Sequence, residues 1–183
     1  GGAYRVLAST SDVAVDSVVI ASGAWSAQLA EPLGIKLPLE AERGYHVEMT
    51  SPSINLRVPV LHREKAIGAV SMEHGLRVAG TVEIGGLTLP PNEGRAELLK
   101  RQAEALLPGL TYGKSSMWMG FRPSTPDSVP ILSNTSSHPG LYFACGHGHT
   151  GMTAGAVSGR LMSQLILKQP TLIDPYPYRL SRF

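Results

Sequence analysis

The chain has 183 residues, of which 43% are apolar and 16% are charged, so it can bury a core and wholesale disorder is excluded. The 16 lysine and arginine residues against 14 acidic residues give a formal net charge of +2, which is too balanced to indicate a nucleic-acid-binding protein. Because Cys145 is the only cysteine, an internal disulfide and a multi-cysteine zinc site are excluded, and a reducing compartment is favoured.

The first forty residues predict two strands and a short helix. Tyr4–Thr10 and Val13–Ala21 have the apolar, β-branched character of strands. Within the second, Ser17–Ala21 is almost continuously apolar, which is typical of a strand buried on both faces of a layered sheet. Ala27–Leu33 follows as a short helix, which Gly34 ends.

The middle of the chain predicts a sheet of short strands. Proline and glycine interrupt it repeatedly between Leu37 and Pro90, as in an antiparallel or mixed sheet. The expected strands are Gly44–Thr50, Val58–His62, Ile67–Met72, Leu76–Val82 and Glu83–Ile84.

One helix and one further strand complete this middle part. Asn92 is a suitable N-cap, and Pro108–Gly109 stops the helix. Its apolar face comprises Ala96, Leu99, Ala103, Leu106 and Leu107. Ser115–Phe121 is the next expected strand, and Pro123–Pro130 is a proline-rich turn.

The end of the chain predicts a strand, a glycine-rich loop and a long helix. Leu141–Cys145 is a short buried strand, and Met152–Lys168 is an amphipathic helix. We expect residues 1–40 and 128–183 to pack together, with residues 41–127 inserted as a second domain. The predicted fold class is therefore a mixture of α/β and α+β. The helix face comprises Ala154, Val157, Leu161, Leu165 and Ile166, and the tail Asp174–Pro177 is expected to be extended.

The loop between this strand and helix is the most informative segment. The glycines Gly146, Gly148 and Gly151 let the backbone approach a ligand closely and adopt positive φ. The first amides of the following helix lack intrahelical partners and lie at the positive end of its dipole. Such a loop suits an anionic or electron-rich group. These properties do not specify the ligand, and a turn that merely packs a helix on a sheet is the alternative.

Four stretches together make the sequence resemble a known family. They are Val18–Ser26, Arg43-Gly44-Tyr45, Gly120–Pro123 followed by Thr125-Pro126-Asp127, and Gly146-His147-Gly148 with Gly151, Thr153, Ser158, Gly159 and Leu161. In this order and over nearly the whole chain, they resemble the C-terminal part of the D-amino-acid oxidase-like flavoproteins. The bacterial D-amino-acid dehydrogenases are the most similar members. Arg77, Gly80 and Glu83 add a weaker match.

The resemblance implies a bacterial FAD-dependent oxidoreductase of amino-acid catabolism. Its FAD/NAD(P)-type layered domain would carry an inserted mixed, mainly antiparallel substrate-binding sheet. Residues 1–40 and 128–183 would then be the C-terminal part of the FAD-binding domain, and residues 41–127 the substrate-binding domain. The reaction implied is oxidative deamination of a D-amino acid or related small secondary amino acid. A hydride passes to flavin N5, and the imine hydrolyses to a 2-oxo acid and ammonia.

The resemblance also implies the site residues. Arg122 would bind the substrate carboxylate through two parallel hydrogen bonds, the alternative being an ion pair with Asp127. Tyr45 would contact the substrate, the alternative being core packing. Arg77 is expected to be structural and to pair with Glu83 or another acid. The expected cofactor contacts are Gly23, Ala24, Trp25, Gly146, His147, Gly148, His149, Thr150, Gly151, Met152 and Thr153. No general base and no metal ligand is assigned.

One part of the family pattern is missing. The family begins with a βαβ unit that carries G-x-G-x-x-G and an acidic residue for the adenosine, and Gly1-Gly2 does not supply it. We therefore expect the chain to be the C-terminal part of a longer enzyme, with weak FAD binding and negligible turnover by itself. Apolar surface left by the missing part would favour self-association. Quinone and oxygen both stay open as the electron acceptor.

Two other classes of protein compete with this hypothesis. Cys145, His147 and His149 alternate, so in an extended strand they would share one face and could bind a metal ion. A non-catalytic fragment that binds a small carboxylate through Arg122 is the other. Of the remaining histidines, His46 and three others are expected to face solvent.

The sequence shows no membrane span and no signal peptide. No apolar run reaches the roughly 18–20 residues that a span needs. The first residues lack the charged and apolar regions of a signal peptide, and they lack methionine. We expect a cytoplasmic protein, with peripheral attachment to the inner membrane as the alternative.

Overall fold

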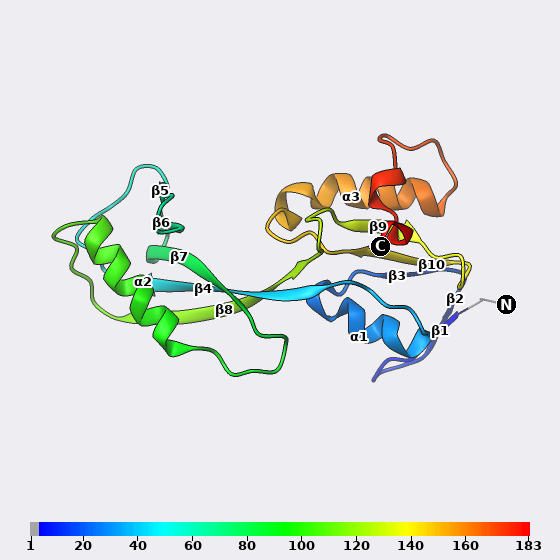
Figure 1. The fold of residues 1–183 in the computed structure, drawn as a ribbon, viewed down its shortest axis with the longest axis horizontal. Coiled ribbons are helices and arrows are strands. Elements are labelled where there is room, and N and C mark those ends of the chain that lie inside the picture. Colours follow the sequence, from blue (N-terminus) through cyan, green and yellow to red (C-terminus); the bar gives the residue numbers. More distant parts are fainter. Residues whose placement is uncertain (1–3) are drawn as a thin grey trace. The chain divides into compact units, whose positions relative to one another are not determined.

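The computed structural model describes residues 4–183. Gly1–Ala3, which belong to the expected domain segment 1–40, therefore lie outside the described residues. The chain forms two compact units, drawn in Figure 1. Unit 1 comprises Gly1–Ala41 and Arg122–Phe183, and unit 2 comprises Glu42–Phe121. The expected boundary after residue 127 therefore lies six residues too late. Segment 122–127 belongs to unit 1 because its backbone is hydrogen-bonded to the glycine-rich loop there.

The first strands of unit 1 are shorter than predicted. Strands β1 (Tyr4–Val6) and β2 (Val13–Val15) form an antiparallel hairpin. The expected strand Val13–Ala21 is divided, because its second part, β3 (Val18–Ile20), pairs with a different strand near the end of the chain. The chain changes partner between β2 and β3, which a local apolar pattern does not reveal.

The core sheet of unit 1 has three strands in the order β3–β10–β9. The central strand β10 (Leu141–Cys145) runs parallel to β3 and antiparallel to β9 (Ile131–Asn134). Strand β9 was not predicted, since it follows the proline-rich turn directly and is only four residues long. The expectation that Ser17–Ala21 is buried on both faces is not met in the described chain, because Val19 is 40% exposed on one face of β3 while Ile20 is buried on the other.

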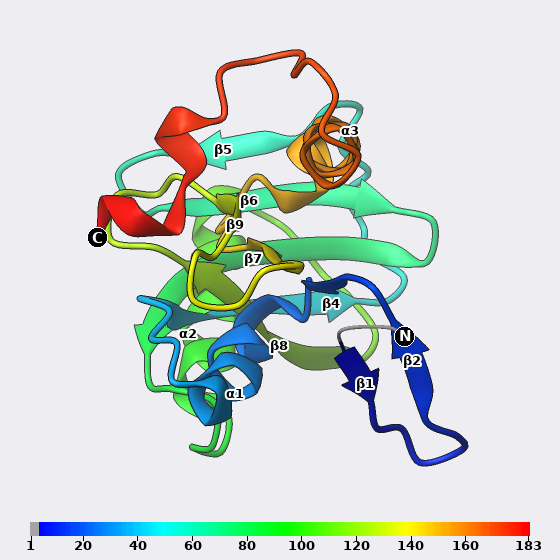
Figure 2. The same ribbon diagram turned by 90° about the vertical axis from the view of Figure 1, so that its right-hand side faces the viewer.

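Helices cover both faces of this sheet, as Figures 1 and 2 show. One face packs against α1 (Ser26–Ala30) and the segment that follows it. The apolar cluster on this face comprises Ile20, Ala30, Ile35, Leu37, Ile131, Leu141, Phe143 and Cys145. The other face packs against α3 (Gly151–Ile166) through Leu132, Leu161 and Met162.

The buried face of α3 differs in part from the prediction. Leu161 is buried as expected, but Val157 is 47% exposed, and Ser158 and Met162 are buried instead. No helix in the described part of the chain, α3 included, combines the length and apolarity needed to cross a membrane.

The C-terminal segment folds back onto the sheet of unit 1, and it is coloured red beside α3 in Figure 2. The expectation of an extended tail at Asp174–Pro177 is wrong, because the chain forms 3₁₀ turns at Tyr176–Tyr178 and Leu180–Arg182. The amide of Leu180 donates a hydrogen bond to Ser133 Oγ of β9 (3.0 Å). This hydrogen bond holds the turns of the C-terminal segment against β9.

Unit 2 is built on a sheet with the strand order β5–β6–β7–β4–β8. Its strands are β4 (Glu40–Met49), β5 (Val60–His62), β6 (Ile67–Met72), β7 (Gly75–Ile84) and β8 (Ser115–Ser124). Neighbours β5–β6, β6–β7 and β7–β4 are antiparallel. The two expected segments at 76–84 form a single strand, β7, with a bulge where Thr81 adopts φ +56° opposite the Gly44/Tyr45 register shift.

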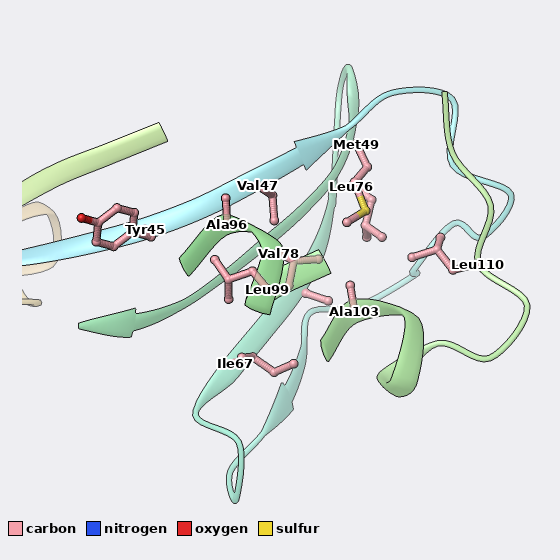
Figure 3. Close-up of a cluster of buried hydrophobic side chains, with 11 residues drawn as sticks. Tyr45, Val47, Met49, Ile67, Leu76, Val78, Ala96, Leu99, Ala103 and Leu110 are labelled. Atoms are coloured by element: carbon pink, nitrogen blue, oxygen red, sulfur yellow. The ribbon is translucent and has the colours of Figure 1, made fainter. Parts of the chain in front are cut away.

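Helix α2 (Glu93–Leu106) covers one face of this sheet. Asn92 caps it as predicted, since its Oδ1 accepts a hydrogen bond from the amide of Gly94 (3.0 Å). Figure 3 shows the resulting core, in which Leu99 and Ala103 of α2 face the apolar side chains of β4, β6 and β7. The strand residues of this core include Tyr45, Val47, Met49, Ile67, Leu76 and Val78.

Candidate functional site

Two loops of unit 1 lie at the same edge of its sheet. Strand β3 leads into a 3₁₀ turn at Gly23–Trp25, and β10 leads into the glycine-rich loop that begins at Gly146. Because β3 and β10 are parallel neighbours, their carboxyl ends meet at one edge. Ligands of α/β sheets characteristically bind at this kind of edge. The two sets of expected cofactor contacts are thus brought together.

The backbone after Arg122 is tied to the same loop. The Pro123 carbonyl accepts a hydrogen bond from the Gly148 amide (2.8 Å), and Ser124 forms an antiparallel bridge with His147. Gly146 permits this close approach, since a Cβ there would lie 2.7 Å from Thr125 Cγ2 and its φ is +79°. Arg122 therefore begins the segment that borders the glycine-rich loop.

One donor atom of the Arg122 side chain has no hydrogen-bond partner within the described residues. This atom is Nη1, and it is buried. Asp127, the alternative partner considered from the sequence, instead binds Arg182 (2.7 and 3.2 Å). The Arg182 hydrogen bonds, more than any other contact, hold the pKa of the Asp127 carboxyl well below its ordinary value. A buried guanidinium nitrogen without a partner calls for an acceptor, and a carboxylate suits it best.

The N-terminus of α3 is also open to a ligand. Its N-cap, Thr150, makes no side-chain capping hydrogen bond. The Thr150 hydroxyl and amide both donate instead to the His147 carbonyl (2.9 Å each). The amides of Gly151, Met152 and Thr153 belong to the first turn of the helix, where amides lack intrahelical acceptors, at the positive end of its dipole. Met152 is fully exposed beside them.

Gly146, Gly148 and Gly151 have the spacing G-x-G-x-x-G between a strand and a helix. This spacing is the fingerprint of dinucleotide-binding βαβ units, and the sequence reasoning overlooked it. In the described chain, however, α3 is followed by the 3₁₀ turns of the C-terminal segment and not by a second parallel strand. The fingerprint also requires an acidic residue at the end of that second strand. The spacing alone therefore does not make this loop a dinucleotide site.

The ring of His147 is held within unit 1. Its Nε2 lies 2.8 Å from the Ser158 hydroxyl of α3, and burial lowers the pKa of His147. The imidazole is therefore neutral near pH 7. Ser158 was not identified as a partner from the sequence, although its position four residues after Ala154 on the helix face is a usable signal.

The alternative metal site is not formed. Within residues 4–183, no group of three histidine, cysteine or acidic side chains could hold a metal ion. Cys145 lies in the core of unit 1, where burial raises the pKa of its thiol to about 11. The two glycines between Cys145 and His149 turn the chain with positive φ, so the three side chains do not share a strand face.

Tyr45 lies in unit 2, and its surroundings favour the packing alternative. Its side chain is 1% exposed, and Figure 3 shows its ring at one end of the apolar cluster. The hydroxyl donates to Glu83 (2.6 Å) and accepts from the Asn92 amide (3.1 Å). Arg77 pairs with an acid, as expected, and this acid is Glu48 (Nε to Oε1 2.9 Å) and not Glu83.

Comparison with known proteins identifies the family. The model of the DAO family, described as FAD dependent oxidoreductase, matches residues 1–165. The chain belongs to this family. It is 37% identical over 182 residues to a D-amino-acid oxidase of Bradyrhizobium diazoefficiens and 34% identical over 170 residues to a D-amino acid dehydrogenase of Allorhizobium ampelinum. These matches cover 97% and 92% of the chain but 43% and 40% of the two relatives.

A solved structure agrees. The crystal structure of glycine oxidase from Geobacillus kaustophilus matches with a TM-score of 0.82 and 26% identity, over 96% of this chain and 48% of that one. The mixed α/β fold with several sheets is thereby confirmed. The chain spans less than half the length of the relatives and of this structure.

The residues of unit 1 fit one end of the flavin that the family uses. The uncapped N-terminus of α3 and the left-handed Gly148 (φ +51°) form a cradle for an electron-rich group. Gly23 (φ +58°) leaves open space beside the exposed Trp25. These features suit an electron-rich part of the cofactor, and the adenosine grip of the family pattern is not among the described residues.

Proposed function

We propose that the protein containing this chain is an FAD-dependent amino-acid oxidoreductase that oxidises a D-amino acid or a related small secondary amino acid. Membership of the DAO family and the identity to two bacterial enzymes of D-amino acids support this proposal. The observation that carries it is the buried, unpartnered Nη1 of Arg122 in the segment bordering the glycine-rich loop.

Arg122 would bind the carboxylate of the substrate. A guanidinium offers a carboxylate two parallel hydrogen bonds, which fix the orientation of the molecule as well as its charge. Because Asp127 is already paired with Arg182, the charge of Arg122 is available to a ligand. Pro123 and the hydrogen bond of its carbonyl to Gly148 would keep the arginine in place.

The glycine-rich loop and α3 would hold the pyrimidine end of the flavin. When bound, FAD supplies the acceptor for the hydride that leaves the substrate Cα. The α3 amides would stabilise the negative charge that this transfer brings to the pyrimidine end. A neutral substrate amine needs no further proton transfer before the hydride leaves, so no side chain is assigned as a base. Positioning would provide most of the catalysis.

We further propose that unit 1 supplies the flavin contacts and that unit 2, together with the segment from Arg122 that follows it in the chain, forms the substrate-binding domain. The first assignment is supported by the two loops at one edge of the β3–β10–β9 sheet. The second is supported by the mainly antiparallel sheet of unit 2, since the resemblance described above implies a substrate-binding sheet of this kind.

Anaerobic mixing with candidate substrates tests the function. The flavin-loaded protein that contains this chain is mixed with D-alanine, D-proline, glycine or sarcosine. We expect at least one to bleach the visible flavin absorbance and to yield its 2-oxo acid with ammonia or methylamine, or the cyclic imine from D-proline. Binding of the carboxylates without bleaching by any of them would instead support the non-catalytic alternative and contradict the proposal.

A further inference from the structure

A hollow of about 530 Å³ lies on the sheet of unit 2, on the face away from α2. Tyr45, Val47 and Met49 of β4 point into the core, so the alternating residues His46 and Glu48 point to the opposite face. The volume falls within the roughly 300–1,000 Å³ of small-molecule sites. The lining residues are His46, Glu48, Arg77, Ser116, Met117 and Trp118.

One wall of the hollow is aromatic. The rings of His46 and Trp118 are stacked, with centroids 4.9 Å apart and planes inclined by 20°. This corrects the expectation that His46 faces solvent. Trp118 nevertheless remains 56% exposed, and it lies over Gly120, where a Cβ would come within 2.0 Å of the indole. The wall thus offers an accessible π surface to a planar group.

The hollow also carries the ion pair of Arg77 and Glu48, beside the aromatic wall, since Oε1 of Glu48 lies 3.9 Å from Nε2 of His46. Arg77 donates through Nε and Nη2 to the same oxygen, Oε1 of Glu48. The hydrogen bonds of this pair use neither Nη1 of Arg77 nor Oε2 of Glu48, and the two side chains are 36% and 43% exposed, so a ligand can reach both charges. Burial, followed by the charge of Arg77, lowers the pKa of His46, so the imidazole is neutral near pH 7. The hollow therefore has no net charge.

We propose that this hollow binds a free aromatic α-amino acid as its zwitterion. The ammonium group would bind Oε2 of Glu48, the carboxylate Nη1 of Arg77, and the ring would pack on Trp118. A lone anion would be repelled by Glu48 and a lone cation by Arg77, whereas adjacent opposite charges on one molecule match the pair. The site uses residues of unit 2 alone, so it depends neither on flavin nor on Arg122.

Fluorescence of Trp118 tests the site directly. The chain contains two tryptophans, so Trp25→Phe leaves Trp118 as the single reporter. Titration with D- and L-phenylalanine is expected to give a saturable change for at least one enantiomer. Removing either charge, as in phenylpropionate or phenethylamine, should weaken binding roughly tenfold or more, because hydrogen bonds to charged groups are the strong ones. Alanine, which has no ring, should bind at least as weakly.

Variants separate the site from general effects. Arg77→Gln and Glu48→Gln in the same background should each abolish the saturable change, while Arg63→Gln, at an exposed turn outside the hollow, should leave it intact. The absence of any saturable change, equal responses to phenylalanine and phenylpropionate, or an unchanged response in Arg77→Gln would overturn the inference. The comparison of ligands keeps the test decisive if an Arg77 variant does not fold.

Discussion

Glu83 connects several elements of unit 2 at the level of single side chains. It accepts a hydrogen bond from Tyr45 (2.6 Å), and its oxygens lie 3.5 Å from Nε of Arg43 and of Arg95. The Tyr45 hydrogen bond first, and then the charges of the two arginines, lower the pKa of Glu83. Since Arg43 is 1% exposed, it depends on this carboxylate for its counter-charge.

We predict that Glu83→Gln destabilises the protein at neutral pH and that the effect disappears in acid. Because the folded-state pKa of Glu83 lies below its ordinary 4.5, its stabilisation is complete above that pH and is lost as the pH falls through the folded value. Denaturant unfolding of both proteins from pH 7 to pH 3 measures this. Glu64→Gln, an exposed turn position, is the control and should show no such pH dependence. An equal deficit of Glu83→Gln at every pH would contradict the prediction.

Single residues also mark where sequence reasoning stops. The role proposed for Arg122 comes from the motif around it. Its unpartnered Nη1 could not be predicted, because Asp127 pairs instead with Arg182, 55 residues away. In the same way, His46 carries no local signal of its stacking on Trp118, which lies on another strand. Contacts between residues distant in sequence depend on the fold, so they cannot be predicted from the local pattern of a single sequence.

At the scale of elements, periodic apolar patterns predicted helices and strands correctly, whereas the points where the chain changes its pairing strand were not predicted. Helix α2, strand β6 and strand β10 match their expected ranges within a residue or two, because each buries one continuous apolar pattern. Strand β9 and the division between β2 and β3 escaped prediction. These strands are three or four residues long, too short for alternation to be distinguished from chance.

The packing of α2 gives a prediction at this scale. Leu99 is completely buried against the sheet, so Leu99→Ala should lower the free energy of unfolding by about 3 kcal/mol through lost burial and a residual cavity. Its neighbour Leu98 is 37% exposed. Leu98→Ala should therefore cost less than roughly 1 kcal/mol. Urea unfolding of the two variants checks the difference, and similar losses would show that the helix is oriented differently.

At the scale of the whole molecule, the chain matches the family over residues 1–165 yet spans 43% of one relative. The layered architecture and the inserted sheet were foreseen because four motifs occur in the family's order. The exact unit boundary at residues 121 and 122 was not, because the hydrogen bond between Pro123 and Gly148 joins distant segments.

We predict that this chain by itself binds FAD weakly. The contacts proposed through α3 and its loop reach only the pyrimidine end of the flavin, and the adenosine grip of the family pattern is not among the described residues. When the chain is titrated with FAD and flavin fluorescence is monitored, we expect weak binding without saturation at low FAD concentration. Gly148→Val should weaken this binding further. A purified chain that retains yellow colour through gel filtration would contradict this expectation.

The most direct test concerns the carboxylate contact of Arg122. In the flavin-loaded protein, the rate of anaerobic bleaching is compared for a D-amino acid and for its amide, which lacks the negative charge. We predict that the native protein prefers the acid by roughly 100-fold or more and that Arg122→Gln loses most of this preference, since the charged hydrogen bonds act on the carboxylate alone. An Arg122→Gln variant that still prefers the acid to the same degree would contradict the account.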